Sequence, residues 1–164
     1  MKALYLLRHA KSSWDNPSLA DLERPLSKRG LKAASLIGKV MGKQGVKVDV
    51  VLCSSAVRTR ETVKLALKAA GLKQEVSYRA KLYAASADEL ANEISGLKDS
   101  VASVLLVGHN PGLADLLYDL CGTVEHFPTA ALARLTLQIS RWGELRQGCG
   151  SLDWLIRPRE VSTG

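Results

Sequence analysis

The chain has 164 residues, of which 46% are hydrophobic and 24% charged, as expected for one globular domain with a substantial core. No apolar stretch is long enough to span a membrane, which excludes the usual transmembrane classes. The formal net charge of +7 favours anionic partners, but lysines that recur along one helical face are ordinary solvated surface, so we do not predict nucleic-acid binding.

Strand and helix signals alternate from the amino terminus onward. The apolar run at residues 3–8 predicts a first strand, and a polar loop that contains Pro17 and Pro25 follows it. Ser27 is a suitable N-cap for a helix that runs to about Gly42, with small and apolar residues on one face.

The middle of the chain repeats this strand–helix unit. Residues 48–53 predict a second strand, and residues 56–70 predict a helix that a glycine ends. A short third strand is expected near 75–78. The capping-box pattern that begins at Ser86 then predicts a helix to about Leu97.

The last third of the chain changes character. Residues 103–107 predict a fourth strand, and the helix expected after Pro111 has the clearest amphipathic pattern of the chain. Residues 135–139 and 152–156 alternate between apolar and polar side chains, at least in part. They predict two paired antiparallel strands at a sheet edge.

This order of elements predicts an α/β fold. Strands that alternate with helices form largely parallel sheets covered on both faces, so we expect a three-layer α/β/α sandwich around a central, mostly parallel mixed sheet. A single domain is expected over residues 1–160, and residues 161–164 are expected to be a frayed tail.

Cationic side chains follow three of the predicted strands. Arg8 and His9 end the first strand, Arg58 follows the second, and His109 follows the fourth. Ligands of α/β sheets bind beyond the carboxyl ends of the strands. Two histidines and two arginines that converge there predict a site for a phosphoryl group.

The chemistry of these residue types supports that prediction. A neutral imidazole is a competent nucleophile at phosphorus, and a covalent intermediate splits one difficult displacement into two easier ones. Arginine binds phosphate through two parallel hydrogen bonds and keeps its charge. Arg8, Arg58 and His109 would supply the positive charge without a metal, and backbone N–H groups of a helix that begins near Pro111 would add donors.

Three segments, each at the end of a predicted strand, resemble the hallmarks of the histidine phosphatase superfamily, also called the phosphoglycerate mutase-like fold: residues 7–9, 54–62 and 107–111. Their order matches over essentially the whole chain. The stretches 8–15, 21–26 and 29–30 are similar to the short SixA-like phosphohistidine phosphatases in particular.

The resemblance implies a metal-independent phosphatase without a cofactor. Such an enzyme would hydrolyse phosphohistidine in proteins through a covalent phosphohistidine intermediate at His9. The resemblance also implies that Arg8, Arg58 and His109 hold the phosphoryl oxygens and that Ser12 is a further phosphate ligand.

Two positions depart from the pattern of the superfamily. Ala10 replaces the glycine of the usual Arg-His-Gly, and residues 82–86 lack the glutamate that serves mutase-like members as general acid. By resemblance Asp21 aligns with the acid proposed for SixA-like members. As a loop carboxylate near Arg24, Asp21 is equally well interpreted as a turn or ion-pair residue. A missing acid would hamper alkyl phosphates more than phosphohistidine, whose imidazole leaving group is less basic.

Other functions stay open at this point. The chain could be a phosphatase for a small phosphomonoester or phosphoserine, or a catalytically silent phosphoprotein-binding module. A metal site at His9 and His109 is disfavoured because no carboxylate or cysteine spacing completes it. The expected partner is a phosphorylated protein or a small phosphate ester, with neither nucleic acid nor a membrane involved. The sequence indicates no oligomeric state.

Cysteine usage points to a compartment. The chain has three cysteines, an odd number without Cys-x-x-Cys spacing, which favours reduced thiols over a disulfide framework or a zinc site. The first apolar run is too short for a signal peptide because Arg8 ends it. We therefore expect a cytoplasmic protein.

Overall fold

Six strands form one mixed sheet in the order β3-β2-β4-β1-β5-β6 in the computed structural model, which describes residues 1–161. The strands are β1 (Lys2–Arg8), β2 (Val50–Ser54), β3 (Val76–Arg79), β4 (Ser103–Gly108), β5 (Leu132–Leu137) and β6 (Gly150–Ile156). The first four strands pair in parallel, whereas β5 pairs antiparallel with both β1 and β6. The predicted mostly parallel sheet with an antiparallel pair at one edge is confirmed.

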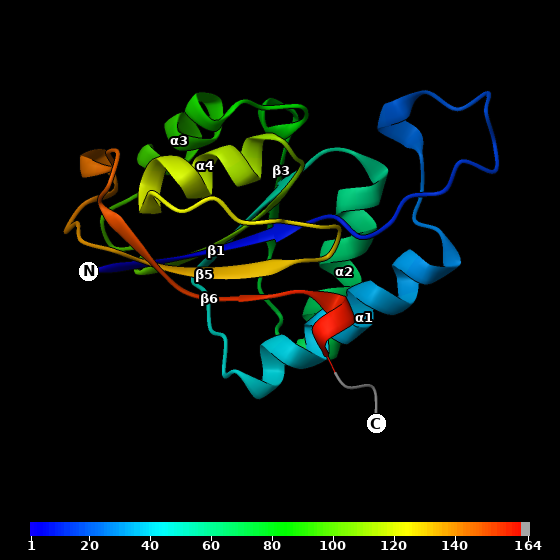
Figure 1. The fold of residues 1–164 in the computed structure, drawn as a ribbon, viewed down its shortest axis with the longest axis horizontal. Coiled ribbons are helices and arrows are strands. Elements are labelled where there is room, and N and C mark those ends of the chain that lie inside the picture. Colours follow the sequence, from blue (N-terminus) through cyan, green and yellow to red (C-terminus); the bar gives the residue numbers. More distant parts are fainter. Residues whose placement is uncertain (162–164) are drawn as a thin grey trace.

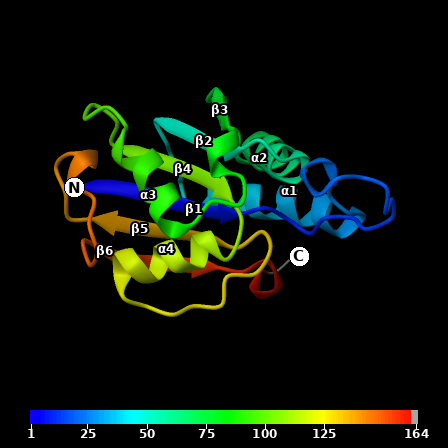
Figure 2. The same ribbon diagram turned by 90° about the horizontal axis from the view of Figure 1, so that it is seen from above.

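Helices cover both faces of this sheet (Figures 1 and 2). The α-helices are α1 (Lys28–Lys43), α2 (Val57–Ala70), α3 (Ala87–Ser95) and α4 (Gly112–Cys121). Short 3-10 helices are η1 (Asp21–Glu23), η2 (Ala80–Leu82), η3 (Trp142–Glu144) and η4 (Pro158–Glu160). The predicted three-layer α/β/α sandwich is therefore confirmed.

Alternate side chains of the central strand β1 enter two separate cores. Leu4 and Leu6 pack in the core beneath α3 and α4, and Tyr5 and Leu7 pack in the core with α1 and α2. Successive side chains of a strand point to opposite faces, so an almost wholly apolar strand is what a sheet buried on both faces requires.

Helix boundaries follow the capping signals of the sequence. The Ser27 hydroxyl accepts a hydrogen bond from Gly30 N at 3.1 Å and starts α1. Ser86 forms the predicted capping box with Glu89. The helix predicted to reach Leu97 ends earlier, at Ser95, because Gly96 is its C-cap.

Two predicted strands were misplaced in part. The strand predicted at 135–139 is β5, which begins three residues earlier, at Leu132. Leu132 and Ala133 are fully buried beside β1, so this part of the strand has no apolar–polar alternation to reveal it. The strand predicted at 48–53 begins only at Val50, because the Asp49 carboxylate accepts hydrogen bonds from the backbone that leads into β4.

Residues 162–164 of the predicted frayed tail lie outside the described residues. In the described part of the chain, no helix combines the length and the apolar character needed to cross a membrane. The three cysteines are free thiols.

Candidate active site

The two histidines meet because β1 and β4 are adjacent parallel strands. Arg8 pairs with Gly108 at the end of the ladder, and His9 N donates a hydrogen bond to Gly108 O at 3.1 Å. The ring centroids of His9 and His109 lie 5.2 Å apart, and both residues are buried. The strand-end convergence expected from the sequence is thus present in the fold.

His9 is held with one ring nitrogen free. Its Nδ1 lies 2.7 Å from the Ala10 carbonyl oxygen, which can only accept, so Nδ1 carries the proton and Nε2 keeps its lone pair. Burial lowers the pKa of His9 from 6.5 to about 4, and the positive charges of Arg58, Arg8 and Arg24 act in the same direction. At neutral pH His9 is therefore an uncharged imidazole, as a nucleophile must be.

His109 is oriented by two neighbours. Its Nε2 lies 2.8 Å from the Ser54 hydroxyl oxygen, and its Nδ1 lies 3.5 Å from Nη2 of Arg58. A guanidinium can only donate, so Nδ1 is the acceptor and Nε2–H donates to Ser54. Burial, followed by the nearby His9, lowers the pKa of His109 to about 3. The fully buried Ser54 ends β2, and its register beside β4 brings it to His109.

Two arginines in this site have unused donors. The Nε atoms of Arg8 and Arg58 are buried, and within residues 1–161 neither has a hydrogen-bond partner. Arg8 Nη1 donates to the Phe127 carbonyl oxygen at 3.2 Å. Burial and the charge of Arg58 lower the pKa of Arg8. The half-buried guanidinium of Arg8 and the buried guanidinium of Arg58 are two like charges that together attract an anion with several acceptor oxygens.

Asp21 occupies the cationic side of the site. Its Oδ2 accepts a hydrogen bond from the Tyr83 hydroxyl at 2.5 Å and from Arg58 Nη2 at 3.0 Å, and its Oδ1 accepts from Arg24 Nη2 at 3.1 Å. The Tyr83 hydrogen bond, followed by those of Arg58 and Arg24, holds the pKa of Asp21 well below its usual range. Asp21 is therefore ionised in the free protein and accepts hydrogen bonds.

Ser12 lies at the rim beside a buried arginine. Its hydroxyl accepts a hydrogen bond from Arg24 Nη1 at 2.7 Å. The guanidinium of Arg24 also stacks on the ring of Trp14, 3.6 Å from the centroid, and Trp14 is 71% exposed. Arg24 thus joins Ser12 to Asp21 and presents an aromatic ring at the edge of the site.

One pocket of about 440 Å³ brings together all the side chains that the sequence analysis selected: Arg8, His9, Ser12, Asp21, Arg58 and His109. Lys11, Trp14, Arg24, Tyr83, Ala84, Asn110 and Thr129 complete its lining. Among residues 1–161, no cluster of three or more His, Cys, Asp or Glu side chains could hold a metal ion.

Sequence reasoning missed three contributors to this pocket. Ser54 lies in a selected motif but had no assigned role, and its contact with His109 depends on strand register. Tyr83 was noted only as part of a stretch without a carboxylate, yet its hydroxyl binds Asp21 across 62 residues of sequence. Arg24 was seen only as a neighbour of Asp21. No local signal in the sequence predicts the contact of Tyr83 with Asp21, whereas the ion pair of Arg24 with Asp21 is the alternative that the sequence left open for Asp21.

Comparison with known proteins places this site in a family. The model of the histidine phosphatase superfamily (branch 1) matches residues 4–90. An uncharacterized protein of Mycobacterium tuberculosis is 35% identical over 164 residues, which cover 93% of this chain and 100% of that protein. The chain belongs to the histidine phosphatase superfamily. The family resemblance seen in the sequence is confirmed.

Two further relatives narrow the comparison within the histidine phosphatase superfamily. The phosphohistidine phosphatase SixA of Escherichia coli is 27% identical, with 94% of this chain and 93% of that protein covered. A solved structure assigned as SixA from Nakamurella multipartitia superposes with a TM-score of 0.82 at 29% identity, and covers 96% of each chain. These SixA-like neighbours support a phosphatase.

Proposed function

We propose that this histidine phosphatase hydrolyses phosphohistidine in proteins through a phosphorylated His9. The observation that carries the proposal is the environment of His9, an imidazole whose Nε2 is unpaired within residues 1–161 and which lines one pocket together with the guanidinium groups of Arg8 and Arg58. A nucleophile beside two anchored guanidiniums fits a phosphoryl group, which offers an electrophilic phosphorus and three anionic oxygens.

The proposed reaction has two displacements. In the first, His9 Nε2 attacks phosphorus, a P–N bond to His9 forms, and the bond between phosphorus and the leaving imidazole breaks with the electron pair. The leaving imidazole takes up a proton. In the second, water attacks phosphorus, the P–N bond to His9 breaks, and inorganic phosphate leaves with neutral His9 restored. Arg8 and Arg58 stabilise the charge on the non-bridging oxygens in both steps, and His109 joins them when the bound anion favours its protonated form, in which Nδ1–H also donates.

In this scheme Asp21 can act as a general acid only after substrate binding has raised its pKa. In the free protein it is ionised because Tyr83, Arg58 and Arg24 donate hydrogen bonds to it. A phosphoryl dianion that takes over Arg58 would remove part of this stabilisation and add a nearby negative charge, and both changes raise the pKa of the carboxyl group. We propose that Asp21 gains a proton in this way and passes it to the leaving group.

The substrate assignment draws on the relatives and on leaving-group chemistry. The Escherichia coli relative is named as a phosphohistidine phosphatase. Residues 82–86 contain no carboxylate, so the site lacks the acid that mutase-like relatives would use for alkyl phosphates. An imidazole departs more readily than an alkoxide, which favours phosphohistidine as the substrate.

We propose a cytoplasmic location on the cysteine usage alone.

Hydrolysis rates for a phosphohistidine protein, for phosphoserine and for p-nitrophenyl phosphate, measured side by side, test the proposal. We expect the phosphohistidine protein and p-nitrophenyl phosphate to be hydrolysed and the phosphohistidine protein to be preferred over phosphoserine. Faster hydrolysis of phosphoserine than of phosphohistidine would overturn the substrate assignment but not the mechanism through His9. Phosphoprotein binding without turnover of any substrate would favour a silent binding module.

A further inference from the structure

A second, larger groove begins at the rim of the active site. It has a volume of about 1510 Å³, and it shares Lys11 and Thr129 with the pocket of His9. One wall is α1, and the other is formed by the end of β6 and η4, which lies against α1 (Figure 1). Pockets for small molecules commonly measure about 300–1,000 Å³. The groove therefore exceeds what a small phosphate ester needs.

The amino-terminal end of α1 is fixed beside the nucleophile. The Lys11 carbonyl oxygen accepts a hydrogen bond from Ser27 N at 2.9 Å, and Gly30 packs so closely on it that an added Cβ would lie 2.1 Å away. The helix then leads away from the active site. At 1.5 Å per residue, the stretch from Arg29 to Lys43 spans about 21 Å.

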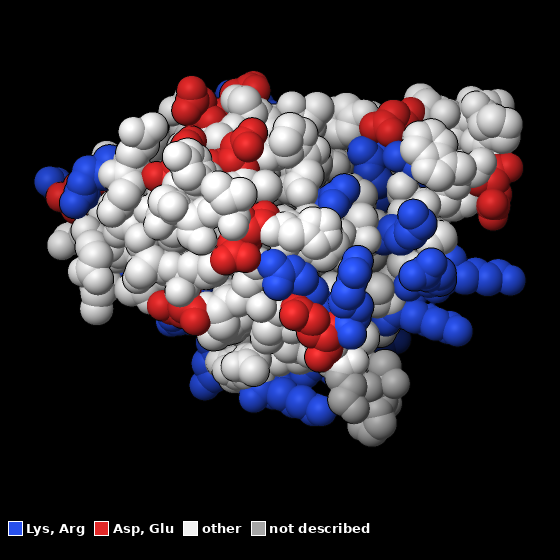
Figure 3. Space-filling model, viewed as in Figure 1, with Lys and Arg blue, Asp and Glu red and all other residues white. Residues whose placement is uncertain are grey.

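Positive charge lines this groove. Its cationic residues are Lys11, Arg29, Lys32, Lys39, Lys43 and Arg159, against a single acidic residue, Glu160. Within residues 1–161 none of these six cations forms an ion pair. Figure 3 shows blue side chains gathered over α1. The sequence alone showed a basic helical face, and the structure connects that face to the active site.

The floor of the groove is apolar. Leu36 and Val40 from α1 face Leu155 and Ile156 from β6 across it. Unpaired cations surround an apolar floor in this groove. A protein segment that has both acidic and apolar side chains therefore fits the groove better than a polyanion that has no apolar side chains.

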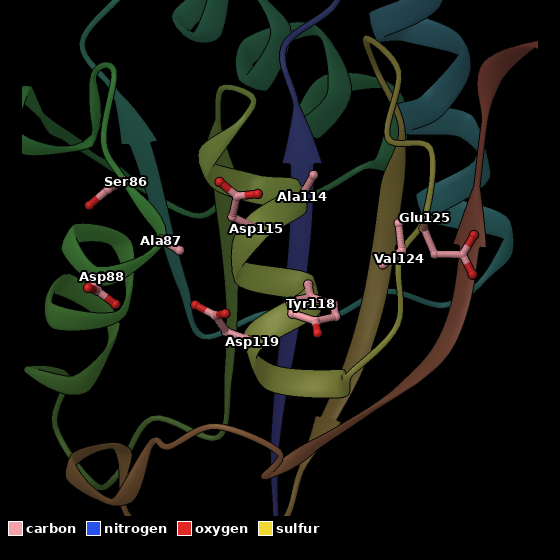
Figure 4. A pocket seen from close by; sticks show the side chains of 9 residues that line it. All are labelled: Ser86, Ala87, Asp88, Ala114, Asp115, Tyr118, Asp119, Val124 and Glu125. Atoms are coloured by element: carbon pink, nitrogen blue, oxygen red, sulfur yellow. The ribbon is translucent and has the colours of Figure 1, made fainter.

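The opposite side of the molecule has the reverse charge. Asp88, Asp115, Asp119 and Glu125 surround a hollow between α3 and α4, together with the exposed Tyr118 (Figure 4). Acidic side chains in Figure 3 gather over these helices. An acidic protein is therefore attracted to the α1 side and repelled from the α4 side, which orients it toward His9.

We propose that the groove along α1 is the docking surface for an acidic, partly apolar face of the phosphoprotein substrate. The proposal rests on the proposed phosphatase function and names the recognition element of its substrate. The phosphorylated side chain enters the pocket of His9 while the acidic face next to it lies along α1. Specificity for a protein over a small ester then comes from contacts outside the chemical site.

Two synthetic phosphohistidine peptides of 20 residues, phosphorylated chemically, serve as probes. One carries alternating glutamate and leucine beside the phosphohistidine, and the other has glutamine in place of every glutamate. We expect kcat/KM to be about 10-fold higher for the acidic peptide at low salt, since each exposed ion pair contributes only modestly. Salt at about 1 M, where the Debye length is about 3 Å, should remove the preference.

The decisive variant is Lys32→Glu/Lys39→Glu, which reverses two exposed charges two helical turns apart on α1. It should lose the preference for the acidic peptide and hydrolyse p-nitrophenyl phosphate like the wild-type protein. The matched control, Lys73→Glu/Lys98→Glu, reverses two exposed lysines that do not line the groove and should keep the preference.

Several outcomes would overturn the docking surface. Equal kcat/KM for both peptides, or equal losses in both double variants, would do so. Tighter binding of a 20-nucleotide DNA than of the acidic peptide would make the groove a nucleic-acid site. Sedimentation that shows a dimer broken by Lys32→Glu/Lys39→Glu, with peptide preference intact, would make it a self-interface. A wild-type protein that hydrolyses neither peptide nor p-nitrophenyl phosphate would instead overturn the proposed function.

Discussion

The carboxylate of Asp21 lies 3.0 Å from Nη2 of Arg58, and Nη1 of the same guanidinium donates to the Asp21 carbonyl oxygen at 2.7 Å. Both terminal nitrogens of Arg58 are thus directed at Asp21, and its Nε has no partner within residues 1–161. A phosphoryl group that binds Arg58 through two nitrogens must displace this carboxylate. Substrate binding and the protonation of Asp21 are therefore linked.

Asp21→Asn should slow substrates in proportion to the basicity of the leaving group. General acid catalysis contributes about 10²–10⁴ where the leaving group needs a proton, so phosphoserine should lose on this scale. The rate on p-nitrophenyl phosphate should fall least. The fall in the rate on phosphohistidine should be closer to that on p-nitrophenyl phosphate than to that on phosphoserine. Initial rates on the three substrates check this. Asp15→Asn, at an exposed loop carboxylate nearby, is the control. Equal losses on all three would mean that Asp21 positions Arg58 and transfers no proton.

His9 should carry the phosphoryl group during turnover. A phosphohistidine is labile in acid and stable in base, so a rapid quench in base after labelled substrate should retain label on the wild-type protein. His9→Ala should lose both label and activity. His126→Ala, which removes an exposed histidine outside the pocket, should keep both. Full activity in His9→Ala would exclude this histidine as the nucleophile.

Arg58→Lys should lower kcat/KM by about 10²–10³, the scale for removing one preorganised donor of a charge-stabilising site. Lysine keeps the charge but cannot replace the planar fork that now faces Asp21 and His109. Arg8→Lys should behave similarly. Arg60→Lys, at an exposed arginine of the same helix, should cost little. Rates of Arg58→Lys close to wild type would remove Arg58 from the phosphate site.

Parallel strand pairing is what made much of the site predictable. Strand ends of a parallel sheet meet at one edge, so His9 and His109 were expected together from strand signals alone. The starts of the neighbouring helices could also be predicted from the sequence, because N-cap residues such as Ser27 and Ser86 are local signals. Residue types at strand ends thus indicated where the side chains of the pocket meet.

Contacts between loops were not predictable in this way. Tyr83 meets Asp21 because the loop that contains η1 packs against α2, and no periodicity in the sequence encodes that path. Arg24 is buried although it is charged, since Trp14 covers it and Asp21 pairs with it. The sequence offered the ion pair of Asp21 with Arg24, but the low pKa of Asp21 also depends on Tyr83 and Arg58, whose contacts with Asp21 the sequence does not indicate.

Catalysis should need no divalent metal. The guanidinium groups of Arg8 and Arg58 supply the positive charge that metal ions supply in other phosphoryl-transfer sites. Phosphatase rates should stay unchanged in excess chelator, and vanadate, which mimics a phosphoryl group, should inhibit. A rate that collapses with chelator and returns with magnesium or zinc would reject the metal-independent mechanism.

The last prediction concerns the protonation of His9. Its pKa of about 4 lies below the ordinary 6.5 because the ring is buried among cations. Between these pH values the unfolded chain binds more protons than the folded one, so stability is fully present above about 6.5 and falls as pH drops toward 4.

NMR titration of the His9 ring protons, assigned through His9→Ala, should give a midpoint near 4, and urea unfolding should show lower stability at pH 4.5 than at pH 7. Inorganic phosphate should raise the midpoint, because an anion beside the ring favours the imidazolium. A midpoint near 6.5 that phosphate leaves unchanged would mean that His9 is hydrated and distant from the anion site, and a neutral buried nucleophile would be the wrong description.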